Sequence, residues 1–288
     1  MLKLAIPNKG RLSEKSVEVL QRAGIRFDYS NERKLFAMAL DGNLQVLFLR
    51  TADIPEFVQD GVVDIGITGR DVVEESGKNV EILQDLSYGK CKLVVAVPED
   101  RGVKSVKDLK SDITVATSFP NLTKKFFDQQ GKKVKIVPVT GATEVTPTLG
   151  VADAITDLVS TGSTLAMNGL VAIGDILHST AVLIGNHAAA KDKAKGERIR
   201  EVTFAIRSVL DAQKKRYLMA DIPKIALRQV EQFLPGIAGP TVMDIATDPT
   251  MAAIHVVVDE DDIYNAVSKL KQLGARGILV IGIDRMVP

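Results

Sequence analysis

Short apolar runs alternate with amphipathic helical patterns from the start of the chain. The run LKLAI (2–6) predicts a strand, and SEKSVEVLQRAG predicts a helix with Ser13 as its N-cap and Gly24 just past its end. A helix beginning near Pro55 is also expected. Alternating strands and helices are typical of an α/β fold. Further strands are predicted at 45–49, 64–68 and 91–98.

A similar alternation of predicted strands and helices begins again after residue 98, which indicates a second α/β lobe. A helix is predicted at 121–131, and two buried strands are expected in quick succession within 171–185. The late strands return to the first lobe, so the second lobe, roughly 93–179, is expected to be inserted in it. Ligands of such folds bind in a cleft at the carboxyl ends of strands. The other strands of this batch are predicted at 112–117, 133–139 and 152–159.

The last third of the chain follows a different pattern. A long helix is predicted over 188–216, and the elements after it read strand, helix, strand, strand, helix, strand. This order is the βαββαβ order of a ferredoxin-like module. We therefore predict a two-lobed unit over 1–206 and a separate module over 207–288.

Composition narrows the possible functions. The chain has 288 residues, 45% of them hydrophobic, and a formal net charge of +1, so nothing in its charge favours nucleic acid or an anionic membrane. A single cysteine, Cys91, excludes an intrachain disulfide, and three scattered histidines match no zinc-binding spacing. The N-terminus resembles neither a signal peptide nor a membrane span. A cytoplasmic protein without a structural metal is expected.

The stretch DLVSTGSTLAMNGL (157–170) carries the most specific chemistry. If 152–159 is a strand and a helix follows it, the turn at 161–165 presents backbone amides, one glycine and three hydroxyl groups, which suit a phosphate monoester. Asp157 and Glu144 lie close upstream, and carboxylates beside a phosphate site suit a ribose diol or a magnesium ion. A helix capped by Ser and Thr with no ligand is the plainer reading of so short a motif.

Another acidic cluster, VVVDEDD (256–262), imitates a ribose-binding motif but precedes a regular helix, whose first turn favours acids. The chain contains neither G-x-x-x-x-G-K-[ST] nor G-x-G-x-x-G, which disfavours a P-loop enzyme and a classical dinucleotide enzyme.

Basic residues and glycine turns also follow several predicted strands. Lys9, Gly10 and Arg11 follow the first strand, where two cations suit a polyphosphate or are simply solvated. GITGRD (66–71) and LSYGKC (86–91) supply further turns.

Six motifs, in order along the chain, resemble those of the ATP phosphoribosyltransferase family. They are NKGRLS, RTADIPEFV, DIGITGRDVV, DLSYGKCKL, ATSFPNLTKKFF and DLVSTGSTL. The resemblance continues through AGPTVMDIA and GARGILVIGI to the end of the chain, and it matches the long, self-regulated form of the family. Lys90 stands where the family often has arginine.

The resemblance implies transfer of the phosphoribosyl group of phosphoribosyl pyrophosphate (PRPP) to N1 of ATP, the first step of histidine biosynthesis. It implies periplasmic-binding-protein-like lobes that close over the substrates, an ACT-like regulatory module, Mg²⁺, feedback inhibition by histidine and dimers that assemble into hexamers. The implied catalytic residues are Asp157, Lys9 and Arg11, and the implied metal ligands are Glu144 and Asp157. PRPP is expected at Asp157, Thr161, Gly162, Ser163, Thr164 and Leu165. ATP is expected at Lys9, Gly10, Arg11, Arg50, Gly69, Asp71 and Tyr88. Histidine is expected at Asp221, Gly239, Pro240, Thr241 and Asp244.

Two other functions are compatible with the same architecture. A prephenate dehydratase also joins two lobes to a ferredoxin-like module, but its Thr-Arg-Phe motif corresponds here to TSF (117–119). A two-lobed solute-binding protein would need an export signal or a DNA-binding module, and the sequence shows neither.

Overall fold

The computed structural model describes residues 1–29, 35–236 and 239–287, and the chain forms two compact units. The first unit contains Met1–Glu18 and Arg26–Thr203, and the second contains Val19–Ile25 and Phe204–Pro288. The division falls inside the helix α7 (Lys193–Gln213), three residues before the boundary expected from the sequence.

The first unit begins with a mixed six-stranded sheet in the order β2-β3-β1-β4-β11-β5. β1 pairs in parallel with β3 and β4, whereas β11 runs antiparallel to β4 and β5. Buried apolar side chains such as Ala5, Ile54 and Val182 pack the sheet against α2. The strands are Leu2–Pro7 (β1), Phe36–Met38 (β2), Leu44–Leu49 (β3), Ile65–Gly69 (β4), Glu81–Asp85 (β5) and Ala181–Gly185 (β11); the helices are Arg11–Arg22 (α1), Ile54–Gln59 (α2), Arg70–Ser76 (α3) and His187–Lys191 (α6).

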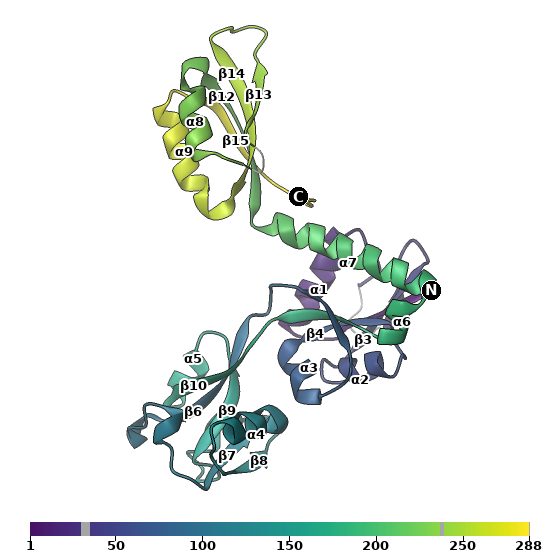
Figure 1. The fold of residues 1–288 in the computed structure, drawn as a ribbon, viewed down its shortest axis with the longest axis vertical. Helices are drawn as coiled ribbons and strands as arrows, with labels where there is room; N and C mark the ends of the chain where they lie inside the picture. The colour runs from purple at the N-terminus through teal and green to yellow at the C-terminus, as the bar shows by residue number, and fades with distance from the viewer. Residues whose placement is uncertain (30–34, 237–238, 288) are drawn as a thin grey trace. The chain divides into compact units, whose positions relative to one another are not determined.

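The chain then builds a second, five-stranded sheet in the order β10-β6-β9-β7-β8, which Figure 1 draws with α4 and α5. The chain enters this sheet after β5 and leaves it through β10 to return to β11, so the sheet is inserted in the first one. This topology is the predicted two-lobed, periplasmic-binding-protein-like architecture. Its strands are Cys91–Pro98 (β6), Ile113–Thr117 (β7), Val134–Pro138 (β8), Ala154–Val159 (β9) and Leu170–Ser179 (β10); its helices are Pro120–Gln129 (α4) and Ser163–Met167 (α5), and its 3₁₀ turns are Glu99–Arg101 (η1), Val106–Asp108 (η2) and Thr143–Val145 (η3).

Three local predictions were wrong. α1 begins at Arg11, so Ser13 is not its N-cap; Ser13 is buried and its hydroxyl lies 3.1 Å from the hydroxyl of Tyr29. The long helix predicted from 188 is interrupted at Asp192, which has an extended backbone and caps α6 at its C-terminus. The two strands within 171–185 exist, but only β11 is fully buried, because β10 exposes several side chains, including Val171.

The second unit contains the predicted βαββαβ order. Its antiparallel sheet has the order β13-β14-β12-β15, and α8 and α9 pack on one face of it through side chains such as Val230 and Leu270 (Figure 1). The strands are Lys215–Pro223 (β12), Thr241–Asp244 (β13), Met251–Asp259 (β14) and Arg276–Gly282 (β15); the helices are Leu227–Phe233 (α8) and Ile263–Gln272 (α9), and the 3₁₀ turns are Lys224–Ala226 (η4) and Glu260–Asp262 (η5).

The acids of VVVDEDD lie in and around η5, just before α9, rather than in the first turn of that helix. Lys215 and Arg216 form ion pairs with Asp259 and Glu260. These contacts agree with the structural interpretation of the cluster. Among the helices of the described residues, none is long and apolar enough to cross a membrane.

Candidate active site

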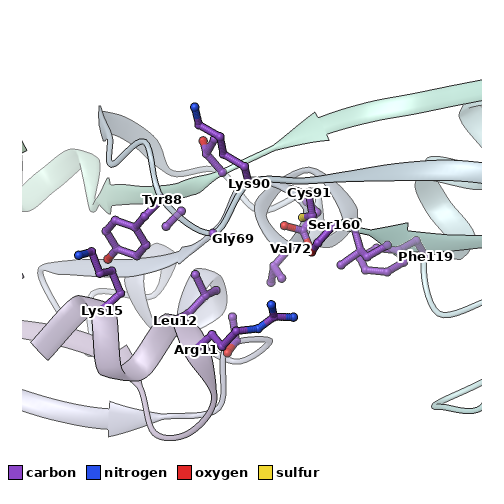
Figure 2. Close-up of a pocket in the computed structure, with 16 residues that line it drawn as sticks. Arg11, Leu12, Lys15, Gly69, Val72, Tyr88, Lys90, Cys91, Phe119 and Ser160 are labelled. Atoms are coloured by element: carbon purple, nitrogen blue, oxygen red, sulfur yellow. The ribbon is translucent and has the colours of Figure 1, made fainter. Parts of the chain in front are cut away.

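A cavity of about 770 Å³ lies in the first unit, and Figure 2 shows the residues that line it. The carboxyl ends of first-sheet strands and the helices that follow them form one wall of this cavity, as expected for an α/β fold. The wall contains Arg11, Leu12 and Lys15 from the first turns of α1, and Thr51, Gly69, Asp71 and Val72 from the ends of β3 and β4 and the start of α3.

The two segments that link the sheets also line the cavity. Tyr88, Gly89 and Lys90 precede β6, and Thr180 precedes β11. A backbone hydrogen bond joins the two linking segments, since the amide of Ala181 donates to the carbonyl of Tyr88 at 2.9 Å. Phe119, Leu158 and Ser160 line the cavity on the second-sheet side, and Cys91 and Ala181 complete the lining. The cavity is therefore lined by both lobes and by both connections between them.

Asp71 is a buried carboxylate on the first-sheet wall. Its Oδ1 accepts a hydrogen bond of 2.5 Å from the hydroxyl of Ser179, and that hydroxyl accepts one of 3.0 Å from the Asp71 amide. A Cβ at position 69 would collide with this carboxylate, which explains the glycine there. Burial and the charge of Asp71 raise the pKa of the Cys91 thiol, which keeps it protonated.

Tyr88 is anchored by a second polar pair. Its hydroxyl lies 2.9 Å from the hydroxyl of Ser16, which itself donates to the carbonyl of Leu12 at 2.6 Å. Burial raises the pKa of Tyr88 well above its usual range. The phenol is therefore neutral at physiological pH.

Asp157 lies on β9, one residue before the pocket-lining Leu158. Successive strand residues point to opposite faces, so Asp157 shares its face with Val159, which packs against the core cluster that contains Leu165 of α5. Burial raises the pKa of the Asp157 carboxyl, and the charge of Glu144 raises it further, whereas the bond from the Leu158 amide opposes both. Asp157 and Glu144 thus form a pair of interacting carboxylates beside the cavity rather than in its lining.

The segment predicted as a turn at 161–165 follows β9, but only Thr161 and Gly162 precede the helix, because α5 already begins at Ser163. Gly162 has φ +81°, a left-handed conformation that favours glycine, and it occupies the N-cap position of α5. Thr161, Ser163 and Thr164 are exposed, and the hydroxyls of Thr161 and Ser163 lie 3.0 Å apart. The Leu165 side chain is buried in the core, so only its backbone is available to a ligand. With five residues, α5 has a short dipole but still leaves its first amides without intrahelical acceptors.

The structure thus divides the predicted site residues into groups. Arg11, Gly69, Asp71 and Tyr88 meet in the cavity. Glu144, Asp157 and the 161–165 turn gather at the end of β9. Lys9, Gly10 and Arg50 are exposed at the ends of β1 and β3 and do not line this cavity.

Several cavity residues were missed by sequence reasoning. Lys15 lies four residues after Arg11 on α1, and this spacing places both on one helix face, so the helical period was a usable signal. Thr51, Phe119 and Thr180 carry no comparable signal, because only the tertiary fold brings them to the cavity.

Two acids do not make a complete metal site. Within the described ranges, no group of three or more His, Cys, Asp or Glu residues could hold a metal ion. Glu144 and Asp157 interact electrostatically and are suitable ligands for Mg²⁺ together with substrate phosphates.

The predicted effector residues lie in the second unit. Asp221 is on β12, Thr241 begins β13, and Gly239 has φ +95°. Asp244 forms an ion pair of 2.7 Å with Lys224, so its carboxylate is already engaged.

The fold and cavity define a two-lobed, periplasmic-binding-protein-like α/β protein that carries a separate ferredoxin-like module. The family model for HisG, ATP phosphoribosyltransferase, matches residues 50–208, and the model for the HisG C-terminal domain matches residues 212–285. The chain belongs to the ATP phosphoribosyltransferase family, whose members are pentosyltransferases of histidine biosynthesis.

Relatives support this assignment over the whole chain. The ATP phosphoribosyltransferase of Methanocaldococcus jannaschii is 48% identical over 289 residues, and that of Gemmatimonas aurantiaca is 46% identical over 293 residues; each match covers 100% of both chains. A chain in the ATP phosphoribosyl transferase (HisG:HisZ) complex from Thermotoga maritima superposes with a TM-score of 0.62 and 29% identity. That match covers 72% of this chain and 99% of the Thermotoga chain.

Proposed function

We propose that the protein transfers the phosphoribosyl group of PRPP to N1 of ATP, which gives phosphoribosyl-ATP and pyrophosphate. The observation that carries this proposal is the exposed hydroxyl turn at 161–165 beside Asp157, in a chain of this family. A phosphate monoester needs several donors and close backbone approach, and the turn offers three hydroxyls and a left-handed glycine.

The turn receives the 5′-phosphate of PRPP in this proposal, and Asp157 faces the ribose hydroxyls. The turn and Asp157 both lie at the end of β9, so the phosphate and the ribose of PRPP would bind side by side there. The ionised carboxylate of Asp157 would also stabilise the positive charge that develops on the ribose ring in the transition state.

ATP occupies the cavity in this proposal. Leu12, Val72 and Phe119 supply apolar surface suited to a base, whereas Arg11 and Lys15 supply charge for the phosphates. Exposed Lys9 and Arg50, outside the lining, are assigned to the outer polyphosphate.

Catalysis in this scheme comes from positioning and electrostatics, without a protein nucleophile. N1 of adenine attacks C1′ as the bond to pyrophosphate breaks, and the leaving group carries the negative charge away. In this scheme Arg11 and Lys9 stabilise that negative charge. Mg²⁺, when bound with Glu144, Asp157 and the pyrophosphate oxygens, would supply further charge neutralisation.

The simplest test is to incubate the purified protein with ATP, PRPP and magnesium and to follow the ultraviolet absorbance of the adduct. Formation of phosphoribosyl-ATP, verified by mass spectrometry, is the expected result. Absence of the adduct from folded protein, with both substrates intact, would overturn the proposed reaction.

We also propose that histidine inhibits the enzyme through the second unit, in an assembly of dimers that form a hexamer. Thr241 and Gly239 are exposed at the start of β13, and Asp221 on β12 offers a carboxylate for the histidine amine. Inhibition requires histidine to bind one state of the assembly more tightly than the other, because a ligand with equal affinity for both states does not shift the equilibrium between them.

Thr241→Arg tests this effector site. The variant should remain active and lose inhibition by histidine, because a large cation replaces a small hydroxyl at the proposed site. Inhibition curves for parent and variant make the measurement, with Thr247→Arg, on the exposed turn after β13, as the matched control. An active Thr241→Arg protein that histidine inhibits as strongly as the parent would place the site elsewhere.

A further inference from the structure

The carboxylate of Glu75 joins the two lobes of the first unit. Glu75 lies near the end of α3, on the first-sheet side, and its Oε1 and Oε2 accept hydrogen bonds of 2.9 Å from the amides of Asn121 and Leu122. The side-chain amide of Asn121 donates to the carbonyl of Glu75 at 2.9 Å. Asn121 and Leu122 belong to the first turn of α4, on the second-sheet side.

α4 depends on this contact for its N-terminal cap. Phe119 occupies the N-cap position and has no side-chain oxygen, so no capping bond comes from within the helix. The first amides of a helix have no intrahelical acceptor and carry partial positive charge. A carboxylate that accepts from two of them therefore provides a cap from the other lobe.

Both helices lead directly into the cavity. α3 begins with Asp71 and Val72, which line the first-sheet wall, and Glu75 is one helical turn beyond Asp71. Phe119 immediately precedes α4 and lines the second-sheet wall, where the hydroxyl of Thr117 accepts from its amide at 2.9 Å. The Glu75 contact thus connects the two walls by a short, hydrogen-bonded path.

We propose that Glu75 is a positioning residue that holds Phe119 and the second-sheet wall against the first-sheet wall, in the arrangement that binds both substrates. The expected effect on the KM values rests on the proposed function. The hydrogen bonds of Glu75 are independent of that function. A ligand that needs both walls binds with an affinity reduced by the fraction of molecules in which the walls are apart. Glu75 raises the fraction in which they are together.

Glu75→Ala is the central variant, and Glu74→Ala is its matched control. Glu74 is the neighbouring residue on α3, has the same charge and is exposed. We expect the KM values for ATP and PRPP to rise about tenfold in Glu75→Ala. We expect kcat to fall by less than about twofold, because saturating substrate restores the arrangement. Glu74→Ala should match the parent, and Glu75→Gln, which keeps one acceptor oxygen, should be intermediate.

Hydrogen exchange provides a readout that is independent of turnover. The amides of Asn121 and Leu122 should exchange faster in Glu75→Ala than in the parent or in Glu74→Ala, whereas core amides of β7 and β9 stay protected. If Glu75→Ala does not fold, Asn121→Ala removes the side-chain bond from the opposite lobe and should give the same KM pattern, weaker in degree.

The outcomes separate the two proposals. Parent protein that forms no adduct contradicts the proposed function, while faster exchange at Asn121 and Leu122 in Glu75→Ala would still support the contact. Unchanged exchange at these amides, or unchanged KM values in a variant whose exchange has increased, would overturn the role of Glu75. A loss of kcat in Glu75→Ala with unchanged KM values would also overturn the role of Glu75. That pattern indicates a smaller fraction of active enzyme rather than displaced walls.

Discussion

Asp71 and Tyr88 in the cavity lining are held by hydrogen bonds to other side chains, whereas the exposed hydroxyls of Thr161 and Ser163 contact each other. Asp71 is fixed by Ser179, and Tyr88 lies against Ser16 in a buried setting. The turn has exposed hydroxyls, and those of Thr161 and Ser163 lie within hydrogen-bond distance of each other. The two parts of the proposed site therefore differ in how many of their polar groups are already hydrogen-bonded within the protein.

This difference indicates different roles. Groups that are already bonded keep their geometry without ligand, and such preorganisation lowers the cost of binding a rigid base. Exposed hydroxyls and unused helix amides retain their capacity for a ligand such as a phosphate. Variants of the turn should therefore have large effects on ligand binding, whereas removal of one hydrogen bond from a bonded lining residue such as Tyr88 should have a small one.

Gly162→Val should have the largest effect. A β-branched residue is strained at φ +81°, and its side chain would occupy the space that a phosphate needs. We expect PRPP affinity to fall by about a hundredfold or more, equivalent to about 2.8 kcal/mol. Titration calorimetry with PRPP measures this, and circular dichroism checks that the fold persists.

Gly169→Val is the matched control, because Gly169 also has positive φ, +65°, and lies just beyond the other end of α5. It should suffer similar backbone strain yet retain PRPP affinity. Equal losses in both variants would attribute the effect to strain in α5 rather than to the turn.

The sequence predicted the turn because its signal is local. A strand, a glycine and hydroxyl residues around the start of a helix are close together in sequence, and the structure has β9, Gly162 and α5 in that order. The strands of both lobes were also predicted, since buried runs such as AVLIG in β11 are continuous and apolar. The short strands β2 and β5 were missed because their patterns are brief and largely exposed.

The bonded residues of the cavity lining were harder to predict because their contacts are distant in sequence. Asp71 and Ser179 are 108 residues apart, and Ser16 and Tyr88 are 72 residues apart. No local pattern encodes such pairs. Apolar content also failed to indicate burial: β15, an edge strand of the sheet in the second unit, is rich in Ile, Leu and Val but largely exposed.

Tyr88→Phe tests a hydrogen-bonded residue of the cavity lining and should have a smaller effect than Gly162→Val. Removal of the hydroxyl deletes one hydrogen bond, while Ser16 keeps its bond to Leu12. We expect a cost of about 1 kcal/mol and a rise of about fivefold in the KM for ATP, with PRPP affinity unchanged. Tyr29→Phe, which removes a comparable contact with Ser13 outside the cavity, is the control and should leave both constants unchanged. A larger effect on PRPP than on ATP would contradict the division between the two regions.

The smallest effect is expected from Glu144→Gln, which tests the electrostatics beside the turn. The charge of Glu144 raises the pKa of Asp157, in addition to the larger effect of burial. If ionised Asp157 is required, kcat/KM falls as the pH drops through the pKa of that carboxyl in the free enzyme. Removal of the neighbouring negative charge favours the ionised form and lowers this pKa, so the acidic limb of the profile should move to lower pH. Glu144→Asp retains the charge and should leave the limb close to its parental position. A shift of the limb to higher pH in Glu144→Gln, or equal shifts in both variants, would show that the charge of Glu144 does not act on the group that controls turnover.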